Sequence, residues 1–153
     1  FKQSQISLTS WPMYVDVLTS LGNLAKDYGI RLALETDLDG KELLGFMKQL
    51  NHPFIGCVYD TGNSIGFDHD IYGDIQLLND FVWHVHIKDK NSFKKNVLLG
   101  EGDVSFEKII GLISKSRSVK TMTFETARGK DPIMTAHHHQ HYIEQIWRKH
   151  QDE

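Results

Sequence analysis

Four residues that can bind a metal stand at or just after the ends of short apolar runs. They are Glu35, Asp60, His86 and Glu125. Three carboxylates and one imidazole suit a hard or borderline divalent ion such as Mn²⁺, Mg²⁺, Co²⁺ or Zn²⁺. No thiolate belongs to the set, which argues against a structural zinc site. The residue types therefore predict one divalent metal ion, provided that the fold brings the four residues together.

Helical and strand patterns alternate along the chain, and this order predicts a parallel α/β sheet with right-handed crossovers. No linker or shift in composition divides the sequence, so residues 1–153 are expected to form a single domain. Ser10 is the expected N-cap of the first helix. The expected helices cover 11–28, 41–50, 70–80, 105–116 and 132–149; the strands cover 30–35, 54–60, 82–89 and 121–125; and the main loops cover 61–66 and 90–103.

In each expected strand the candidate ligand lies on the smaller or more polar face. Side chains alternate between the two faces of a strand. Leu34 therefore faces away from Glu35, and Phe124 faces away from Glu125. In α/β barrels and open α/β sheets the functional site lies at the carboxyl ends of the strands. We therefore expect the four candidates to meet at that edge.

The third expected strand carries an unusual polar face. Alternation places His84, His86 and Lys88 on one side, and apolar residues such as Trp83 and Val85 on the other. Nitrogen-bearing side chains inside a core require polar partners. The position at the strand end favours His86 as the ligand. Lys88 is expected to reach toward a substrate, whereas His84 is either a substrate or supporting group or a core histidine with its own partners.

Composition excludes several classes of function. The net charge of −3 gives no basic surface for nucleic acid. No apolar run approaches the ~20 residues that a membrane-spanning helix needs. Cys57 is the only cysteine, which fits a reducing compartment and a cytoplasmic location. The sequence opens on Phe1 rather than Met, so a fragment or a processed product is an open expectation.

Five short motifs in order resemble the xylose isomerase-like TIM barrel family, specifically its sugar phosphate isomerase/epimerase branch. They occupy 32–35 (LALE), 59–63 (YDTGN), 84–89 (HVHIKD), 99–106 (LGEGDVSF) and 123–125 (TFE). The resemblance implies a parallel (β/α)₈ barrel whose strands five to eight carry these motifs. A full barrel needs ~250 residues. The chain is therefore expected to be a C-terminal half-barrel, with an N-terminal half-barrel or another copy of itself as partner.

The resemblance also implies the chemistry. The family binds one divalent metal through residues matching Glu35, Asp60, His86 and Glu125. Its isomerases and epimerases move a proton beside a carbonyl of a small carbohydrate, through an enediolate that the metal stabilises. Glu35 and Glu125 would then also be the catalytic acid/base pair.

Two departures from the family pattern bear on the substrate. Ketose 3-epimerases of this family usually carry a His where this sequence has Asn63, and an Arg where it has Ser92. These differences weaken the interpretation of the chain as an epimerase of free ketoses. Asn63 is kept as a candidate substrate-binding residue. Lys88 and Arg128 could instead hold a phosphate or carboxylate. The loop 90–103 lacks the extra His and Asp ligands of the family's nuclease branch.

Two other functions remain open from the sequence. One is a metal-dependent dehydratase or lyase of the same family, similar to inosose dehydratase. The other is a non-catalytic barrel fragment or binding module. Among the remaining residues with possible chemistry, we interpret His137, His138, His139 and His141 as a solvated histidine-rich helix, in which only His137 and His141 are spaced to chelate a metal. We interpret Cys57 as a packing residue and Asp89 as a loop or cap residue.

Overall fold

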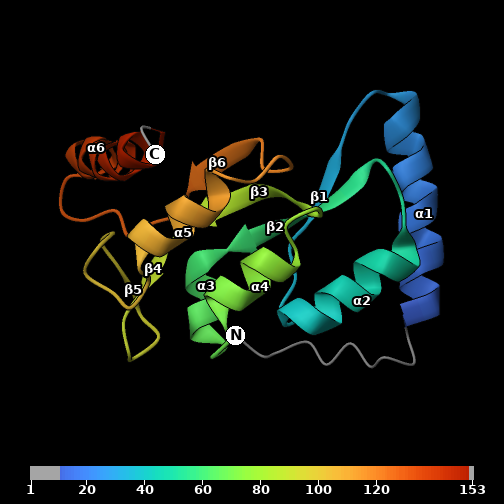
Figure 1. The fold of residues 1–153 in the computed structure, drawn as a ribbon, viewed down its shortest axis with the longest axis horizontal. Coiled ribbons are helices and arrows are strands. Elements are labelled where there is room, and N and C mark those ends of the chain that lie inside the picture. Colours follow the sequence, from blue (N-terminus) through green and yellow to red (C-terminus); the bar gives the residue numbers. More distant parts are fainter. Residues whose placement is uncertain (1–10, 152–153) are drawn as a thin grey trace.

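The chain forms a four-stranded parallel sheet, seen in the computed structural model, which describes residues 11–151 (Figure 1). The expected cap Ser10 lies outside the described residues. The order in space equals the order in sequence, which is the pattern of consecutive strands in a barrel wall. The strands are β1 (Leu32–Leu34), β2 (Ile55–Asp60), β3 (Val82–Ile87) and β6 (Thr121–Phe124).

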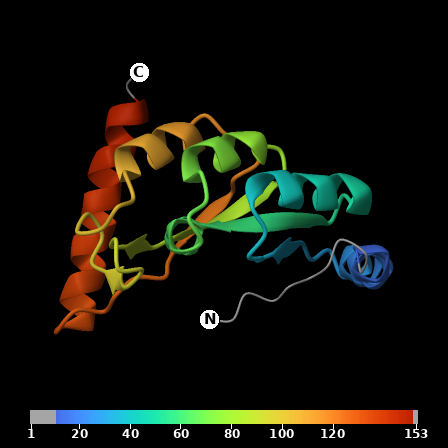
Figure 2. The same cartoon turned by 90° about the horizontal axis from the view of Figure 1, so that it is seen from below.

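Three helices cover one face of this sheet, and Figure 2 shows the opposite face without a helix in the described part of the chain. The covering helices are α2 (Gly40–Leu50), α4 (Ile71–Leu77) and α5 (Phe106–Ile113). Helix α1 (Trp11–Asp27) lies beyond the β1 edge, and α6 (Pro132–Gln151) packs against α5 at the other end. The sheet therefore has a buried outer face and an open inner face.

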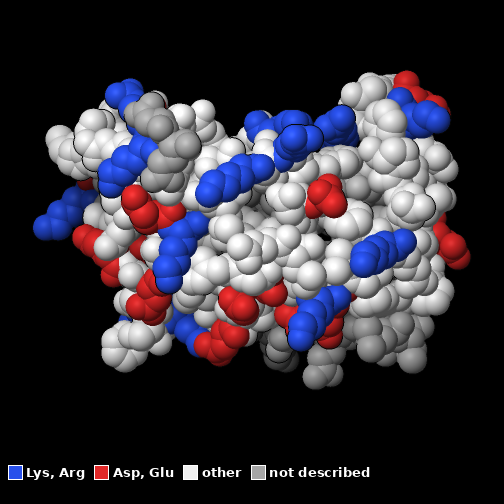
Figure 3. Space-filling view, in the orientation of Figure 1, with Lys and Arg blue, Asp and Glu red and all other residues white. Residues whose placement is uncertain are grey.

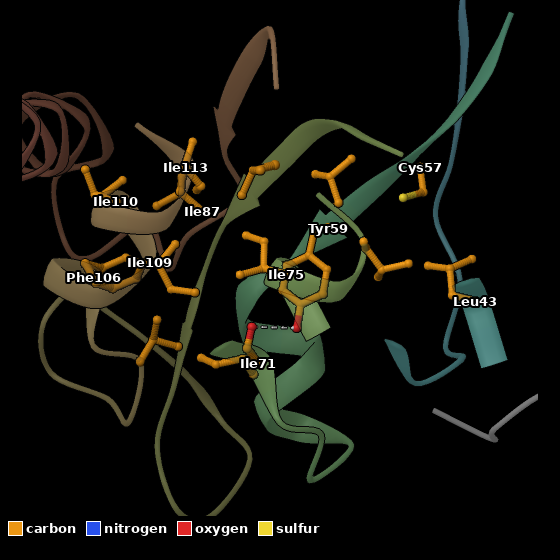
Figure 4. Close-up of a cluster of buried hydrophobic side chains, with 14 of the residues drawn as sticks. Leu43, Cys57, Tyr59, Ile71, Ile75, Ile87, Phe106, Ile109, Ile110 and Ile113 are labelled. Carbon is orange, nitrogen blue, oxygen red and sulfur yellow. Dashed lines mark hydrogen bonds between the residues drawn. The ribbon is translucent and has the colours of Figure 1, made fainter. Parts of the chain in front are cut away.

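The hydrophobic core fills the space between the outer face and the covering helices (Figure 4). Val85 and Ile87 of β3 are fully buried there, against the isoleucines of α5. Tyr59 enters the same core and donates its phenol proton to the carbonyl of Ile71 over 3.2 Å. Cys57 is also fully buried, and burial raises the pKa of its thiol to about 12, which confirms a packing role.

One expected loop is a helix. Residues 61–66 form α3 (Thr61–Gly66), for which the strand-end residue Asp60 is the N-cap. Its Oδ1 accepts a hydrogen bond from the N–H of Asn63 over 2.7 Å. A capping carboxylate satisfies N–H groups that a first helical turn leaves unpaired. The turn-forming residues of this segment suggested a loop, but the cap stabilises a short helix instead.

The expected loop 90–103 contains a small hairpin. Strand β3 ends at Ile87, and β4 (Asp89–Lys90) pairs antiparallel with β5 (Asn96–Val97). Asp89, expected in a loop or cap, is fully buried in this second sheet. The hairpin is a correction to the sequence analysis, which extended the third strand to residue 89.

The placement of Trp83 beside Val85 was wrong. The register passes from the pair Cys57 and Val82 to the pair Val58 and His84, so Trp83 is an extra residue on β3. Such a β-bulge reverses the alternation locally. Val82 consequently joins the buried outer face, and the indole lies over Gly56, where a Cβ would come within 2.2 Å of the ring.

Strand β6 is an exposed edge, which alternation alone did not anticipate. Met122 and Phe124 point toward the helix side, yet they remain 37% and 40% exposed.

The helix-covered face carries Lys and Arg side chains interspersed with Asp and Glu, and neither sign of charge covers it alone (Figure 3). Among the described helices, none combines the length and apolar content needed to cross a membrane.

Candidate metal centre

The structure brings the four candidate ligands together at the carboxyl edge of the sheet. Each of Glu35, Asp60, His86 and Glu125 offers one donor atom, and these atoms all lie within 4.8 Å of one another. The imidazole Nδ1 of His86 is 3.2 Å from a Glu125 oxygen and 3.7 Å from oxygens of both Glu35 and Asp60. One donor comes from each of the four strands or the residue that follows it.

The sheet and its loops fix these side chains to different extents. Asp60 is 5% exposed and is held by its capping bond to α3. Glu125 follows β6, and its N–H still donates to the carbonyl of Ile87 over 3.1 Å. The side chains of Glu35 and Glu125 are 44% and 52% exposed, because they lie at the rim of the open inner face. The cluster therefore has a buried floor and two accessible carboxylates.

The imidazole of His86 provides the test of whether a metal fits. Its Nδ1 is buried, points toward the carboxylates and makes no hydrogen bond within residues 11–151. A buried nitrogen left without a partner is costly. Three carboxylate oxygens and one free imidazole nitrogen in a single cluster form a donor set that a divalent ion can satisfy. The residues present therefore fit the predicted ion.

Lys88 also reaches into the cluster. Its Nζ lies 2.8 Å from Asp60 Oδ2, 2.9 Å from Glu125 Oε2 and 3.4 Å from the side-chain oxygen of Asn63. The residue is only 5% exposed. Its backbone is held by Thr61, whose hydroxyl accepts from the Lys88 N–H and donates to the Lys88 carbonyl.

These contacts shift the ionisation of the cluster. Burial raises the pKa of the Asp60 carboxyl, and the hydrogen bond from Lys88 offsets only part of that effect. Partial burial acts in the same direction on Glu125, but hydrogen bonds led by that from Lys88 outweigh it and lower the pKa of that carboxyl. The pKa values of the two carboxyls therefore move in opposite directions from their ordinary values.

The other predicted substrate residues differ in their distance from the cluster. Asn63 donates to a Glu35 oxygen over 3.3 Å and so borders the ligands. The ring of His84 lies 5.1 Å from that of His86 and bonds to the Thr121 hydroxyl. Arg128 is exposed in the loop after β6 and makes no hydrogen bond or ion pair within residues 11–151. Their roles toward a substrate stay predictions.

Sequence reasoning missed two supporting residues. Thr61 is fully buried and holds the backbone of Lys88, as described above. Asp89 accepts N–H groups from Gly100, Gly102 and Val104 over 2.9 to 3.2 Å, and so shapes the glycine-rich loop. The signal available in the sequence was a carboxylate next to the polar strand end, followed by a segment rich in glycine.

Residues 2–147 match the family described as xylose isomerase-like TIM barrel. The chain therefore belongs to the xylose isomerase-like TIM barrel family, as the five motifs had indicated. Among the curated relatives, L-ribulose-5-phosphate 3-epimerase UlaE of Escherichia coli is 35% identical over 74 residues. That match covers 48% of this chain and 26% of the relative.

Solved structures confirm the fold. An L-ribulose 3-epimerase superposes with a TM-score of 0.81 and 17% identity, covering 95% of this chain and 57% of that one. The probable 3-DHS dehydratase AsbF of Bacillus anthracis superposes with a TM-score of 0.76 and 16% identity, covering 93% of this chain and 59% of that one. The zinc-bound IOLI protein superposes with a TM-score of 0.71 and 18% identity, covering 94% of this chain and 58% of that one. The chain thus spans somewhat over half of these structures and forms part of a barrel.

Proposed function

We propose that the chain carries the metal centre of a divalent-metal-dependent isomerase or epimerase of a sugar or sugar phosphate. The observation that supports it is the convergence of Glu35, Asp60, Glu125 and His86, whose buried Nδ1 makes no hydrogen bond in the described part of the chain. A bound divalent ion supplies electrophilic polarisation of substrate oxygens. The relatives named as epimerases support a carbohydrate substrate, and the zinc-bound relative supports a metal.

Glu35 and Glu125 are proposed as the acid/base pair. They follow β1 and β6, the two outer strands of the sheet, and so approach the cluster from opposite sides. Both side chains are accessible from the open inner face. The pKa of Glu125 is lowered from its ordinary value, so this carboxylate is ionised near neutral pH and can accept a proton. One glutamate would remove a proton beside the carbonyl, and the other would return a proton on the opposite side.

The remaining polar residues are proposed to bind the substrate. Asn63 and His84 border the ligands, and Lys88 and Arg128 are the candidates for an anionic group such as a phosphate. A complementary half-barrel, supplied by four further βα units or by another copy of the chain, would close the inner face over the substrate. No nucleic-acid or membrane partner is proposed, and we expect a cytoplasmic protein.

Solvent exchange tests this proposal. In the complete protein loaded with Mn²⁺, L-ribulose 5-phosphate in D₂O should gain deuterium at the carbon beside its carbonyl. Glu125→Gln should lower the exchange rate by about 10²- to 10⁴-fold, the usual contribution of a general acid or base. EDTA should abolish exchange, and added Mn²⁺ should restore it. Glu101→Gln, a change at an exposed glutamate in the loop after β5, is the matched control.

The alternatives predict different results in this assay or in a thermal-shift measurement with Mn²⁺. A dehydratase, favoured by the structural similarity to AsbF, would release water from the substrate and accumulate an unsaturated product. A non-catalytic fragment or binding module would show no Mn²⁺-dependent thermal shift. Exchange that survives Glu125→Gln at the wild-type rate would contradict the assigned acid/base pair.

A further inference from the structure

Lys88 places an ammonium group where the metal ligands converge. Its Nζ lies within 2.9 Å of oxygens of both Asp60 and Glu125, two of the four proposed ligands. These are the same oxygens, Oδ2 and Oε2, that approach His86 Nδ1. The ammonium group and a metal ion would therefore compete for one set of lone pairs.

The chain is shaped to admit this side chain. A Cβ on Gly62 would lie 2.5 Å from Lys88 Cγ, so the absence of a side chain at residue 62 makes room for the aliphatic stem. The Thr61 hydroxyl holds the Lys88 backbone by accepting a hydrogen bond from its N–H and donating one to its carbonyl. A buried ammonium is stable only when it is paired with opposite charge. Hydrogen bonds and charge from Asp60 and Glu125 supply that pairing.

A divalent ion that bound these oxygens would stand close to the ammonium group. Metal–oxygen bonds in such sites are about 2.0–2.6 Å long. An ion bound to Asp60 Oδ2 and Glu125 Oε2 would thus stand next to Nζ, and the two positive charges would repel each other strongly. We propose that Lys88 is a built-in counter-ion, which neutralises the ligand carboxylates in the metal-free protein and which the divalent ion displaces.

The inference rests on the proposed metal centre and adds two consequences to it. The metal-free protein gains stability from Lys88, because Asp60 and Glu125 would otherwise repel each other. Metal binding is weakened by Lys88, because its ion pairs must break first. The displaced side chain has a long flexible stem, and Glu125, which its ammonium group contacts, is 52% exposed at the rim of the cluster. Displacement would therefore move the ammonium toward solvent.

Calorimetric titration of the complete protein with MnCl₂ tests the competition. We expect Lys88→Met to lower the Kd for Mn²⁺ at least about tenfold, and to lower the melting temperature in EDTA. Lys94→Met is the matched control, since it removes the same charge from an exposed ion pair with Asp68. The control should leave the Kd within about twofold of wild type. An unchanged or higher Kd in Lys88→Met would overturn the inference.

Amine acetylation followed by mass spectrometry gives a second readout, which needs no variant. In EDTA, Lys88 should react at least about fivefold more slowly than the exposed Lys94, because its ammonium is buried and paired. Addition of Mn²⁺ should accelerate labelling of Lys88 and leave that of Lys94 unchanged. If the protein binds Mn²⁺ but the labelling rate of Lys88 does not change on its addition, the displacement of Lys88 is overturned and the metal centre is not. Absence of Mn²⁺ binding in wild type and Lys88→Met alike would overturn the metal centre itself.

Discussion

Asp89 is a buried carboxylate whose partners are backbone groups. One of its oxygens accepts from the N–H groups of Gly100 and Gly102, and the other accepts from that of Val104. Three N–H groups of one loop are thereby satisfied by a single side chain. The adjacent residue is Lys88, so the carboxylate fixes both the loop and the chain that leaves the metal ligands. Its influence on the site passes through the backbone.

Replacing Asp89 by Asn should destabilise the protein although it changes few atoms. The amide oxygen can still accept two N–H groups, but the amide nitrogen would face the N–H of Val104. A buried donor left without an acceptor costs about 1–3 kcal/mol, and we expect a loss of this size in urea unfolding. Asp103→Asn, at an exposed position in the same loop, should change stability by less than about 0.5 kcal/mol. Equal effects of the two substitutions would contradict this account of Asp89.

At the scale of elements, helix α6 is fixed to the sheet edge by His139. The Nε2 atom accepts the N–H of Leu99 over 3.2 Å, so the ring proton belongs on Nδ1, 2.9 Å from the Thr126 hydroxyl. The residue is 4% exposed, so the expectation of a solvated histidine was wrong for His139, and burial lowers the pKa of its imidazole. The fold therefore holds the neutral ring, and a second ring proton would oppose the Leu99 N–H.

This arrangement predicts a stability that depends on pH. Because the folded pKa of His139 lies below the unfolded value of about 6.5, the unfolded chain takes up the proton first as the pH falls. Its contribution is complete above about pH 6.5 and is lost below it. The free energy of unfolding should fall less between about pH 7.5 and about pH 5.5 in His139→Gln than in wild type. His141→Gln, two residues further along α6 and exposed, should retain the wild-type slope. Identical slopes in all three proteins would contradict the assignment.

The sequence predicted the elements that obey a simple period. Alternation and the strand-end positions placed Glu35, Asp60, His86 and Glu125 correctly at one edge, since side-chain phase along a strand is local information. The prediction from alternation was wrong for Trp83, because the bulge depends on the space over Gly56 in the neighbouring strand. The helix α3 and the β4–β5 hairpin also depend on contacts with neighbouring segments. No periodic pattern of apolar residues marks either of them in the sequence.

At the scale of the whole molecule, two ends of the sheet expose apolar surface. On α1 and directly after it, the exposed side chains include Met13, Val17, Leu24 and Tyr28, which are 53–73% accessible. At the start of α6, Ile133 and Met134 are 74% and 55% accessible. Unpaired strand edges and exposed apolar groups favour association with another chain or segment. A complementary half-barrel would cover both ends at once.

Residues 1–153 alone should therefore associate or unfold with low cooperativity. Analytical ultracentrifugation should detect dimers or larger species, and calorimetry should show a broad transition. Leu24→Lys, on the exposed face of α1, should reduce association, whereas Lys26→Glu on the same helix should not. A monodisperse monomer that melts cooperatively would contradict this expectation.

The four donors stand on consecutive strands of one sheet, and this placement bears on how such a site can evolve. Convergence of the donors needs no residue from an opposite wall of the barrel. Capture of an ion and recognition of a substrate can then be inherited separately. The same metal-bearing half could be recombined with different opposite halves, so that new substrates are acquired while the chemistry at the ion is retained.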